Sequence, residues 1–276
     1  MLKNVAIVVL NWNGWKDTIS CLESLKKLDY GNFKLVVVDN SSTDDSVAKI
    51  QQAVPGIELL QTGANLGFGG GCNAGIRHAL SGGADYVWLV NSDAVADSKA
   101  LLALVRVADE NPALASVGSV LYEFDPVDKV QLWGGSRVNL WSGQSRHQRV
   151  QGPLDFISGA SLLLRRAALE EVGLFDQETF FMYWEDTDIQ FRMRKAGWQI
   201  AVADDSRLWH KQFASLGKHS ALLDQYFTQS GVRFFRRHAP VPFIPISLML
   251  GRMLSKRLFK GQINRVKAVL KGFWAA

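Results

Sequence analysis

The sequence predicts an α/β protein with a mostly parallel central sheet flanked by helices. Apolar, β-branched runs that are typical of strands buried on both faces occur repeatedly within the first 98 residues. Segments with helical spacing separate these runs, and this alternation is the pattern of a parallel sheet. A basic segment from residue 225 to the end has amphipathic helical spacing, so a helical C-terminal tail is expected.

Strands and helices alternate regularly in the first 98 residues. Strands are predicted at residues 5–10, 35–38, 57–60 and 86–90. Helices are predicted at residues 18–27 and 44–53, and a glycine-rich loop at 65–71 opens a third helix that ends near residue 80. Ligands bind outside the carboxyl ends of the strands in such sheets. Polar residues stand at the predicted ends, namely Asn11, Asp39, Asn65 and Asp93.

The alternation loosens after residue 98. Helices are predicted at residues 99–110, 166–172 and 186–195, and strands at 116–122, 130–133, 156–164 and 199–203. The polar, Gly- and Arg-containing stretch 137–152 reads as a surface loop. We therefore divide the chain into residues 1–98, 99–224 and 225–276.

Composition restricts the class of protein. The chain has 276 residues, 47% hydrophobic and 21% charged, which is ordinary for a globular protein. Its two cysteines, Cys21 and Cys72, lie far apart in predicted helices, so no disulfide and a reducing cytoplasm are expected. No apolar run reaches the roughly 18 residues that a membrane-spanning helix needs.

The segment Asn91-Ser92-Asp93 follows the fourth predicted strand. An acidic side chain at a strand end can bind a divalent cation through oxygen, and the cation can bridge a diphosphate. The same residue types also favour a simple turn. These three residues alone leave both interpretations open.

Two adjacent carboxylates, Glu185 and Asp186, begin a predicted helix. A carboxylate at a helix start often acts only as a cap that the helix dipole stabilises. Here the pair follows the aromatic-rich run 179–184, so a carboxylate could be partly desolvated beside ring surfaces. That environment suits a general base acting on a hydroxyl, which is the alternative to the cap.

His210 and Lys211 form a further candidate pair. A neutral imidazole at His210 could complete a metal site begun by Asp93, and Lys211 could face a phosphate. A lone histidine is more often structural or solvated, so His210 taken alone is weak support for a metal site.

The glycine-rich loop allows an alternative function. Gly69, Gly71 and Ala74 fit a loose G-x-G-x-x-A pattern, which would suit a NAD-dependent oxidoreductase. The pattern follows the third strand instead of the first, and this alternative leaves Asp186 and His210 unexplained. More generally, glycines before a helix let backbone amides approach a phosphate closely.

Taken together and in order, these segments resemble family 2 glycosyltransferases, which have the GT-A fold, and in particular their bacterial rhamnosyltransferase-like branch. The resemblance covers roughly residues 4–215, and the order and spacing of its segments make it specific. In the first half the matching segments are VVLNWNG (8–14), VVVDNSSTD (36–44), NLGFGGGCN (65–73) and LVNSD (89–93). In the second half they are SGA (158–160), GLFD (173–176), FFMYWEDTD (180–188), AGW (196–198) and WHK (209–211).

The resemblance implies a role for each candidate residue. Residues 1–98 would be the nucleotide-binding half and residues 99–224 the acceptor-binding and catalytic half. The nucleotide sugar would be bound by Asn11, Asp39, Asn65, Gly67, Asn73, Asn91, Asp93 and Lys211. Trp184, Ser158 and Gly159 would bind the acceptor, Asp186 would be the catalytic base and Glu185 would support it. Mn²⁺ or Mg²⁺ would be held by Asp93 and His210, with Asn91 replacing the first acid of the DXD-type motif.

The resemblance also implies a reaction. A sugar would move from dTDP-rhamnose or a UDP-sugar to an acceptor hydroxyl with inversion, and Asp186 would take the proton. The helix N-terminus is expected to keep this carboxylate ionised. The acceptor would be a saccharide or lipid-linked saccharide in bacterial surface polysaccharide or lipopolysaccharide assembly. A non-catalytic sugar-nucleotide-binding protein on the same scaffold is the other alternative.

The tail, residues 225–276, has ten Lys or Arg residues and no Asp or Glu. A basic amphipathic helix is expected at 251–274, after an uncharged linker or shallow insertion at 241–245. Its apolar stripe consists of Leu254, Leu258, Ile263, Val266, Leu270 and Phe273. Such a helix can lie on an anionic membrane or pack on the domain or a partner subunit. We expect peripheral contact with the inner face of the cytoplasmic membrane, and no nucleic-acid binding.

Overall fold

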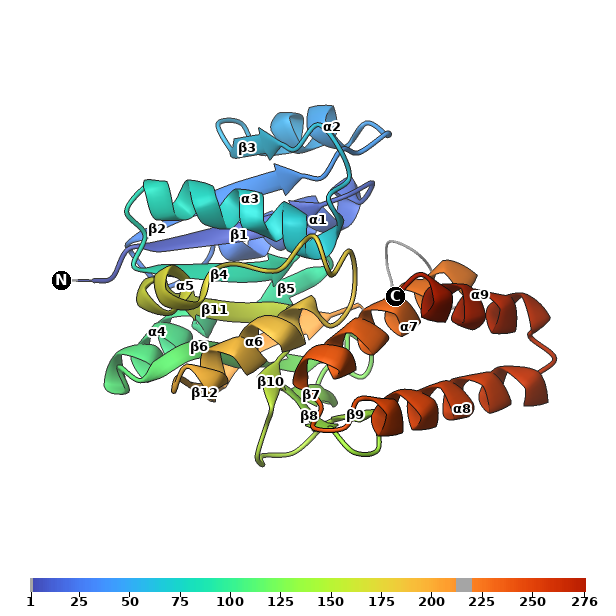
Figure 1. The fold of residues 1–276 in the computed structure, drawn as a ribbon. Helices are drawn as coiled ribbons and strands as arrows, with labels where there is room; N and C mark the ends of the chain where they lie inside the picture. The colour runs from blue at the N-terminus through green and yellow to red at the C-terminus, as the bar shows by residue number, and fades with distance from the viewer. Residues whose placement is uncertain (1, 212–219) are drawn as a thin grey trace.

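The structure is a computed structural model that describes residues 2–211 and 220–276 (Figure 1). Its first part alternates strands and helices, as the sequence predicts. The strands are β1 (Val5–Asn11), β2 (Phe33–Asp39), β3 (Glu58–Gln61), β4 (Tyr86–Asn91) and the unpredicted β5 (Ala94–Ala96). The helices are α1 (Trp15–Leu25), α2 (Ser46–Ala53), α3 (Gly67–Ser81) and α4 (Ala100–Glu110).

The second part is richer in strands than the sequence predicts. Its strands are β6 (Leu114–Tyr122), β7 (Val130–Trp133), β8 (Gly135–Asn139), β9 (Gln144–His147), β10 (Phe156–Ile157), β11 (Ser161–Arg165) and β12 (Gln199–His210). Its helices are α5 (Arg166–Val172) and α6 (Glu185–Lys195), and the tail contains α7 (Ala221–His238), α8 (Phe243–Phe259) and α9 (Ile263–Trp274).

Nine of these strands form one sheet in the order β3-β2-β1-β4-β11-β6-β12-β5, with β7 paired to β6. Six strands run in the same direction, while β5, β7 and β11 run antiparallel to their neighbours. The prediction of a mostly parallel sheet flanked by helices is therefore confirmed. A second sheet of three strands has the order β10-β8-β9.

Both faces of the central sheet are buried, which explains the continuous apolar strands of the sequence. Residues that alternate along β1 point to opposite faces. Val5, Ile7 and Val9 lie in one apolar cluster with residues of α1 and α4, and Val8 lies in another with residues of α3, α5 and α6. The two cysteines are free and belong to different clusters, Cys21 to the first and Cys72 to the second.

The prediction that residues 137–152 form a surface loop is wrong. This stretch contains most of β8 and all of β9, which pair as an antiparallel hairpin. Val138 is buried from this hairpin, whereas Arg137 and Asn139 on either side of it are exposed. The alternation typical of a strand was not recognised in the sequence, because within 137–139 only Val138 is buried and its neighbours are polar.

Two strand boundaries also differ from the sequence prediction. The strand expected at 156–164 is interrupted, because residues 158–160 leave the sheet between β10 and β11. The strand expected at 199–203 continues to His210 past an irregularity between Ala203 and Arg207. Polar residues at this irregularity concealed the extension, and it is the extension that carries His210 into the site described below.

The tail is helical, but it is not the single helix predicted at 251–274. Two helices, α8 and α9, are separated at Gly261, which has a φ of +63°. The segment 241–245 is not a linker throughout, since α8 begins at Phe243. The predicted stripe does not form one surface either, because Leu258, Ile263 and Leu270 are exposed while Val266 and Phe273 are partly buried.

Asp224 holds the three tail helices together. Its carboxylate on α7 accepts a hydrogen bond from Arg257 of α8 at 2.9 Å and two from Arg265 of α9 at 2.5 and 2.9 Å. Asp224 is 5% exposed, so both guanidinium groups compensate a buried charge. The tail is therefore a folded part of the molecule, and α9 packs along α7.

The glycines at 67–71 belong to α3 and do not form the predicted loop. The loose G-x-G-x-x-A pattern therefore lies within a helix and does not form a phosphate-binding loop. Small residues are needed here because α3 lies very close to the sheet. A Cβ on Gly75 would overlap Val8 Cγ1 and come within 3.0 Å of Val38 Cγ2.

This close approach predicts opposite effects for one substitution at two helical glycines. Gly75→Ala should lower the free energy of unfolding by about 1 kcal/mol, because overpacking of about 1–3 kcal/mol exceeds a helix-propensity gain of about 1 kcal/mol. Gly251→Ala is the control, since no atom lies within 4 Å of its added Cβ. It should raise stability by about 0.5–1 kcal/mol. Urea unfolding measures both, and equal effects would contradict the close packing of α3.

Candidate active site

The carboxyl ends of β1 and β2 place Asn11 opposite Asp39 in the parallel register. Asn11 Nδ2 donates to Asp39 Oδ1 at 2.7 Å, and Thr18 Oγ1 donates to Asn11 Oδ1 at 2.7 Å. Ser42 donates to both Asp39 oxygens, from its hydroxyl at 2.6 Å and its backbone amide at 3.0 Å. Asn11 and Asp39 are thus buried, and their side chains are hydrogen-bonded, as is usual for buried polar groups.

Asn40, which the sequence analysis did not single out, connects the strand ends to the start of α3. Its Nδ2 donates to Asn65 Oδ1 at 3.1 Å and to the Gly67 carbonyl at 3.0 Å. Gly67 has a φ of +72°, and a Cβ there would overlap the carbonyl of Phe181. The predicted pair Asn65 and Gly67 therefore stands next to Asn11 and Asp39.

Asn73 does not join this group. It is buried on α3, where its Nδ2 donates to the Phe175 carbonyl at 2.8 Å and its Oδ1 accepts from the Phe175 amide at 3.0 Å. Both ends of the amide are used to hold the chain that leads to α6. The side chain therefore has a positioning function in this structure.

Asp93 and His210 meet although 117 residues separate them in the sequence, because β12 pairs with β5. His210 Nε2 lies 3.2 Å from Asp93 Oδ1 and 3.2 Å from Asn91 Nδ2. Gln131 fixes the ring, since its Nε2 donates to the His210 carbonyl at 2.8 Å and its Oε1 faces Nδ1 at 2.9 Å. Gln131 is a site residue that the sequence analysis missed.

These donors fit a divalent metal ion. The bond to Gln131 assigns the proton of a neutral His210 to Nδ1, so the lone pair of Nε2 faces the Asp93 carboxylate. Two adjacent ligands of a six-coordinate ion at about 2.1–2.2 Å lie roughly 3 Å apart, close to the observed separation. Within residues 2–211 and 220–276 no three acidic, His or Cys side chains gather as a complete metal site.

The charge at Asp93 is stabilised by its surroundings. Burial acts to raise the pKa of Asp93. When His210 is protonated on both ring nitrogens and no metal ion takes its Nε2, its Nε2–H hydrogen bond and its charge outweigh burial, so this pKa is lowered. Lys211 follows His210 and forms an ion pair with Asp17 Oδ1 at 2.5 Å. Lys211 is therefore beside the Asp93 and His210 pair, as predicted, with its amine bound to α1.

Residues 158–160 join the Asp93 region to the start of α6. The backbone N–H of Asn91 donates to the Ala160 carbonyl at 3.1 Å, and the backbone N–H of Gly159 donates to Asp186 Oδ2 at 3.0 Å. A Cβ on Gly159 would lie 3.1 Å from Phe68 Cζ, so a larger residue would disturb this contact. The interruption of the predicted strand thus places Ser158 and Gly159 beside the predicted base.

Asp186 and Glu185 have little compensation for a negative charge. Burial raises the pKa of Asp186, although amide hydrogen bonds from Gly159 and Thr187 oppose this effect. Burial and the Asp186 charge raise the pKa of Glu185 well above its ordinary value. Glu185 Oε2 is buried and has no hydrogen-bond partner among the described residues. Burial thus opposes the expected effect of the helix N-terminus, since the pKa of Asp186 is raised and not lowered.

Trp184 lies in the core instead of on an open surface. Its ring is 5% exposed and contacts Phe234 and Phe235 of α7, with centroid distances of 4.7 and 5.2 Å. Tyr183 and Trp184 have φ values of 68° and 69°, a conformation that is rare for side-chain-bearing residues. Asp186, two residues after Trp184, accepts from the Gly159 amide, while the Trp184 ring anchors α6 to the tail.

Asp188 fixes α6 from its other side. It is fully buried and accepts from Arg192 at 2.8 Å, Arg237 at 3.0 Å and His238 at 2.8 Å. Burial raises its pKa, but the His238 and Arg192 hydrogen bonds outweigh burial, so the pKa of Asp188 is lowered. Asp188 thus forms ion pairs that stabilise the fold, whereas Asp186, two residues earlier, forms none within the described residues.

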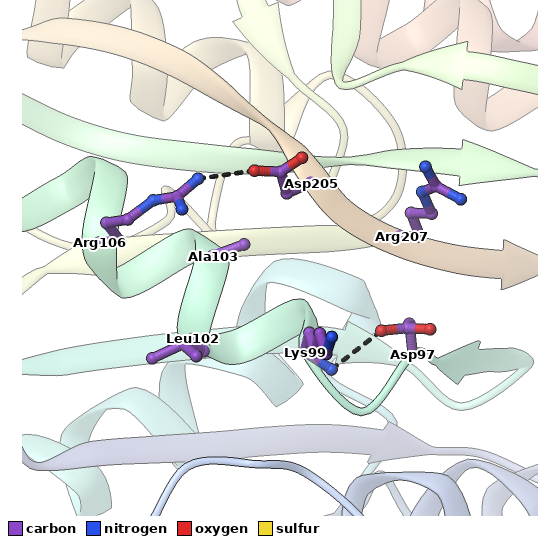
Figure 2. A pocket seen from close by; sticks show the side chains of 7 residues that line it. All are labelled: Asp97, Lys99, Leu102, Ala103, Arg106, Asp205 and Arg207. Atoms are coloured by element: carbon purple, nitrogen blue, oxygen red, sulfur yellow. Dashed lines mark hydrogen bonds and ion pairs between the residues drawn. The ribbon is translucent and has the colours of Figure 1, made fainter.

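A surface pocket between α4 and β12 is separate from this site (Figure 2). Asp97, Lys99, Leu102, Ala103, Arg106, Asp205 and Arg207 line it. None of these residues belongs to the predicted site, and Arg106 is paired with Asp205 at 2.7 Å. The polar strand ends and the start of α6, not this pocket, hold the candidate chemistry.

Comparison with known proteins identifies the type of molecule. Residues 6–173 match the model of a family described as Glycosyl transferase family 2. An N-acetylglucosaminyl-diphospho-decaprenol L-rhamnosyltransferase of Mycobacterium tuberculosis is 31% identical over 215 residues, which cover 68% of this chain and 69% of that relative. The galactofuranosyltransferase GlfT1 of the same organism is 29% identical, covering 73% of this chain and 69% of the relative.

A solved structure shares the fold. The mannosyltransferase PcManGT from Pyrobaculum calidifontis, in complex with GDP-Man and Mn²⁺, matches with a TM-score of 0.63 and 18% identity. The match covers 100% of this chain and 74% of that chain. The predicted GT-A fold is confirmed.

The Asp188 cluster yields a stability prediction. Asp188→Asn should lower the free energy of unfolding by about 3 kcal/mol at pH 7, because it removes a charge that compensates buried cations. A lowered pKa means that the carboxylate stabilises fully above its unfolded pKa of about 3.9 and loses this effect as the pH falls through the folded value. The difference between wild type and variant should therefore shrink in acid, as followed by urea unfolding.

The exposed pair between Asp205 and Arg106 provides the control for this measurement. Asp205→Asn should cost less than about 1 kcal/mol, because surface ion pairs contribute little. Equal losses for the two variants, or a pH-independent loss for Asp188→Asn, would contradict the structural function of Asp188.

Proposed function

The chain belongs to glycosyl transferase family 2, and we propose that it is an inverting, metal-dependent enzyme that transfers a sugar from a nucleoside diphosphate to an acceptor hydroxyl. The observation that carries this proposal is the connection through residues 158–160. One backbone segment contacts both the Asn91 strand end, near the Asp93 and His210 pair, and the Asp186 carboxylate. A diphosphate site and a base are thus held by one rigid support.

The strand ends of β1 and β2 would bind the nucleoside. Asn11, Asp39 and Ser42 form a preorganised hydrogen-bonded group, and Asn65 and Gly67 adjoin it through Asn40. Groups fixed before binding lose little entropy when the ligand arrives, which favours affinity. Lys211 would contribute positive charge toward the phosphates after exchanging its contact with Asp17.

Asp93 and His210 would hold Mn²⁺ or Mg²⁺, with the amide of Asn91 beside them. When bound, the cation would offset the negative charge that develops on the departing diphosphate. Gln131 keeps His210 oriented and selects its tautomer, which is the usual task of a group behind a metal ligand.

Asp186 would act as the general base. A carboxylate with a raised pKa accepts a proton more readily than an ordinary one, provided that it is ionised at the working pH. The acceptor hydroxyl would transfer its proton to Asp186 while its oxygen bonds to the anomeric carbon and the nucleoside diphosphate leaves. A single displacement of this kind inverts the anomeric carbon. The raised pKa of Glu185 favours its neutral form, which would avoid a second negative charge beside the base.

The acceptor would be a saccharide or a lipid-linked saccharide of bacterial surface polysaccharide or lipopolysaccharide. Ser158 and Gly159 adjoin Asp186 and so line the acceptor side. The rhamnosyltransferase relative, by its name, acts on a decaprenol-linked sugar, which supports this class of acceptor and makes dTDP-rhamnose a donor to test alongside UDP-sugars. We place the enzyme on the inner face of the cytoplasmic membrane, in contact through residues 225–276.

The general-base assignment predicts a kinetic defect. Asp186→Asn should lower kcat by about 10²–10⁴-fold, because an amide cannot take the acceptor proton. The wild-type rate should fall as the pH drops through the Asp186 pKa, which lies above the ordinary value of about 3.9. Release of nucleoside diphosphate measures both quantities. Asp205→Asn should leave the rate unchanged, and an Asp186→Asn enzyme with a normal rate would rule out this base.

The metal and donor assignments predict a ligand-dependent change in melting temperature. UDP or dTDP at about 100 times its Kd should stabilise the fold by about 2.7 kcal/mol, and the shift should grow with Mn²⁺. GDP and NADH serve as comparison ligands. Asp93→Asn and His210→Ala should remove the Mn²⁺-dependent part and keep the rest. Stabilisation by NADH alone, or an unchanged Mn²⁺ effect in both variants, would contradict the assignments.

A further inference from the structure

Two basic segments without any acidic residue lie far apart in the sequence. Residues 129–154 contain Lys129, Arg137, Arg146 and Arg149, and residues 225–276 contain ten Lys or Arg residues. The first segment forms the β8–β9 hairpin and its flanks, and the second forms most of α7 and all of α8 and α9. From the sequence alone, membrane contact was predicted only for the second segment, residues 225–276.

The fold brings these segments into direct contact. Arg252 Nη2 of α8 donates to the Ser142 carbonyl in the β8–β9 turn at 2.5 Å. Gly143 of that turn lies very close to α8. A Cβ added to Gly143 would overlap the carbonyl oxygen of Pro245 and would lie 3.2 Å from Met249 Cβ. The turn and α8 therefore form one continuous surface.

Large apolar side chains project from this surface into solvent. Trp141 in the turn is 54% exposed, Phe243 at the start of α8 is 77% exposed and Phe259 at its end is 92% exposed. Ile244, Leu248 and Leu258 are also exposed, at spacings that place them on one face of α8. Aromatic and aliphatic side chains in this density on a charged surface are typical of contact with a bilayer interface.

The cations around these residues are available to a ligand. Arg257 and Arg265 are paired with Asp224, whereas Lys256, Lys260, Lys267 and Lys271 are exposed and form no ion pair within the described residues. Lysine stems can lie along apolar surface while their amines reach lipid phosphates. No helix in the described part of the chain has the length and apolarity to cross a membrane.

We propose that Trp141 of the β8–β9 turn, the exposed face of α8 and the lysines of α8 and α9 together form a docking surface for an anionic lipid bilayer. We call it the lipid-docking surface. Charge decides the occupant: the two contributing segments have only basic charged residues, so a second copy would meet like charge, while anionic phospholipids supply the opposite charge.

The lipid-docking surface is connected to the catalytic carboxylate. The β8–β9 hairpin pairs with β10, and β10 leads directly into the residues whose Gly159 amide binds Asp186. The tail helices lie beyond the carboxyl ends of the parallel strands of the central sheet (Figure 1). Given the proposed glycosyl transfer, on which this step rests, a lipid-linked acceptor held in the bilayer would reach Asp186 from this side.

A fluorescent label tests the part of the surface that the sequence did not suggest. Because Cys21 and Cys72 are buried, a cysteine placed by Trp141→Cys can be labelled selectively with a polarity-sensitive dye. Its emission should shift to shorter wavelength with phosphatidylcholine vesicles that contain phosphatidylglycerol, and much less without phosphatidylglycerol. Leu102→Cys on α4, which is 45% exposed in the wild type, is the control and should not respond.

Charge reversal tests the electrostatic part. Lys256→Glu/Lys260→Glu should weaken partitioning into phosphatidylglycerol vesicles at least about tenfold in co-sedimentation. Lys26→Glu/Lys27→Glu, directly after α1, changes the net charge equally at exposed positions and should leave partitioning unchanged. Equal losses in the two double variants would overturn the location of the surface.

Three results would overturn the proposal. The protein could fail to bind the vesicles, it could bind while the label at position 141 stays unchanged, or the label could respond without vesicles as protein concentration and dimer mass rise. The last result would identify a second copy as the occupant. Stabilisation by UDP or dTDP with Mn²⁺ is measured on the same samples, so failure of lipid docking is distinguishable from failure of the glycosyltransferase site.

Discussion

The hydrogen bond from the Gly159 amide to Asp186 determines how the two parts of the site are joined. Residues 158–160 connect β10 of the three-stranded sheet to β11 of the central sheet, and they contact the Asn91 strand end on one side and α6 on the other. The absent side chain at Gly159 lets the Phe68 ring and the base approach the same backbone. The Asn91 strand end and the start of α6 therefore share one backbone support.

Carboxylates around α6 and the tail divide into two kinds in this protein. Asp188 and Asp224 are each surrounded by two arginines or more, and they hold α6 and the tail helices in place. Asp186 and Glu185 have no cation partner among residues 2–211 and 220–276, and burial raises their pKa values. The difference has a physical meaning: paired acids stabilise the fold, whereas an uncompensated acid costs stability and gains basicity.

The tail shows how a structural element can also serve a surface. Its inner side anchors the Trp184 ring and pairs Arg237 with Asp188, so α7 supports the helix that begins with the base. Its outer side exposes aromatic residues and unpaired lysines next to the β8–β9 turn. The tail thus supports α6 through α7, while the proposed lipid-docking surface lies on α8, α9 and the β8–β9 turn.

The sequence alone determined the α/β alternation, because strands buried on both faces must be continuously apolar, and it identified Asp39, Asp93, Asp186 and His210 as candidate residues. Tertiary structure decided which of them meet. The contact of Asp93 with His210 depends on β12 continuing past an irregularity, and the burial of Trp184 depends on α7. The contacts of Gln131, of Asn40 and of the β8–β9 turn that carries Trp141 are made with residues distant in the chain. They could not be predicted from sequence, because a local pattern indicates which face of an element is apolar and not what packs against it.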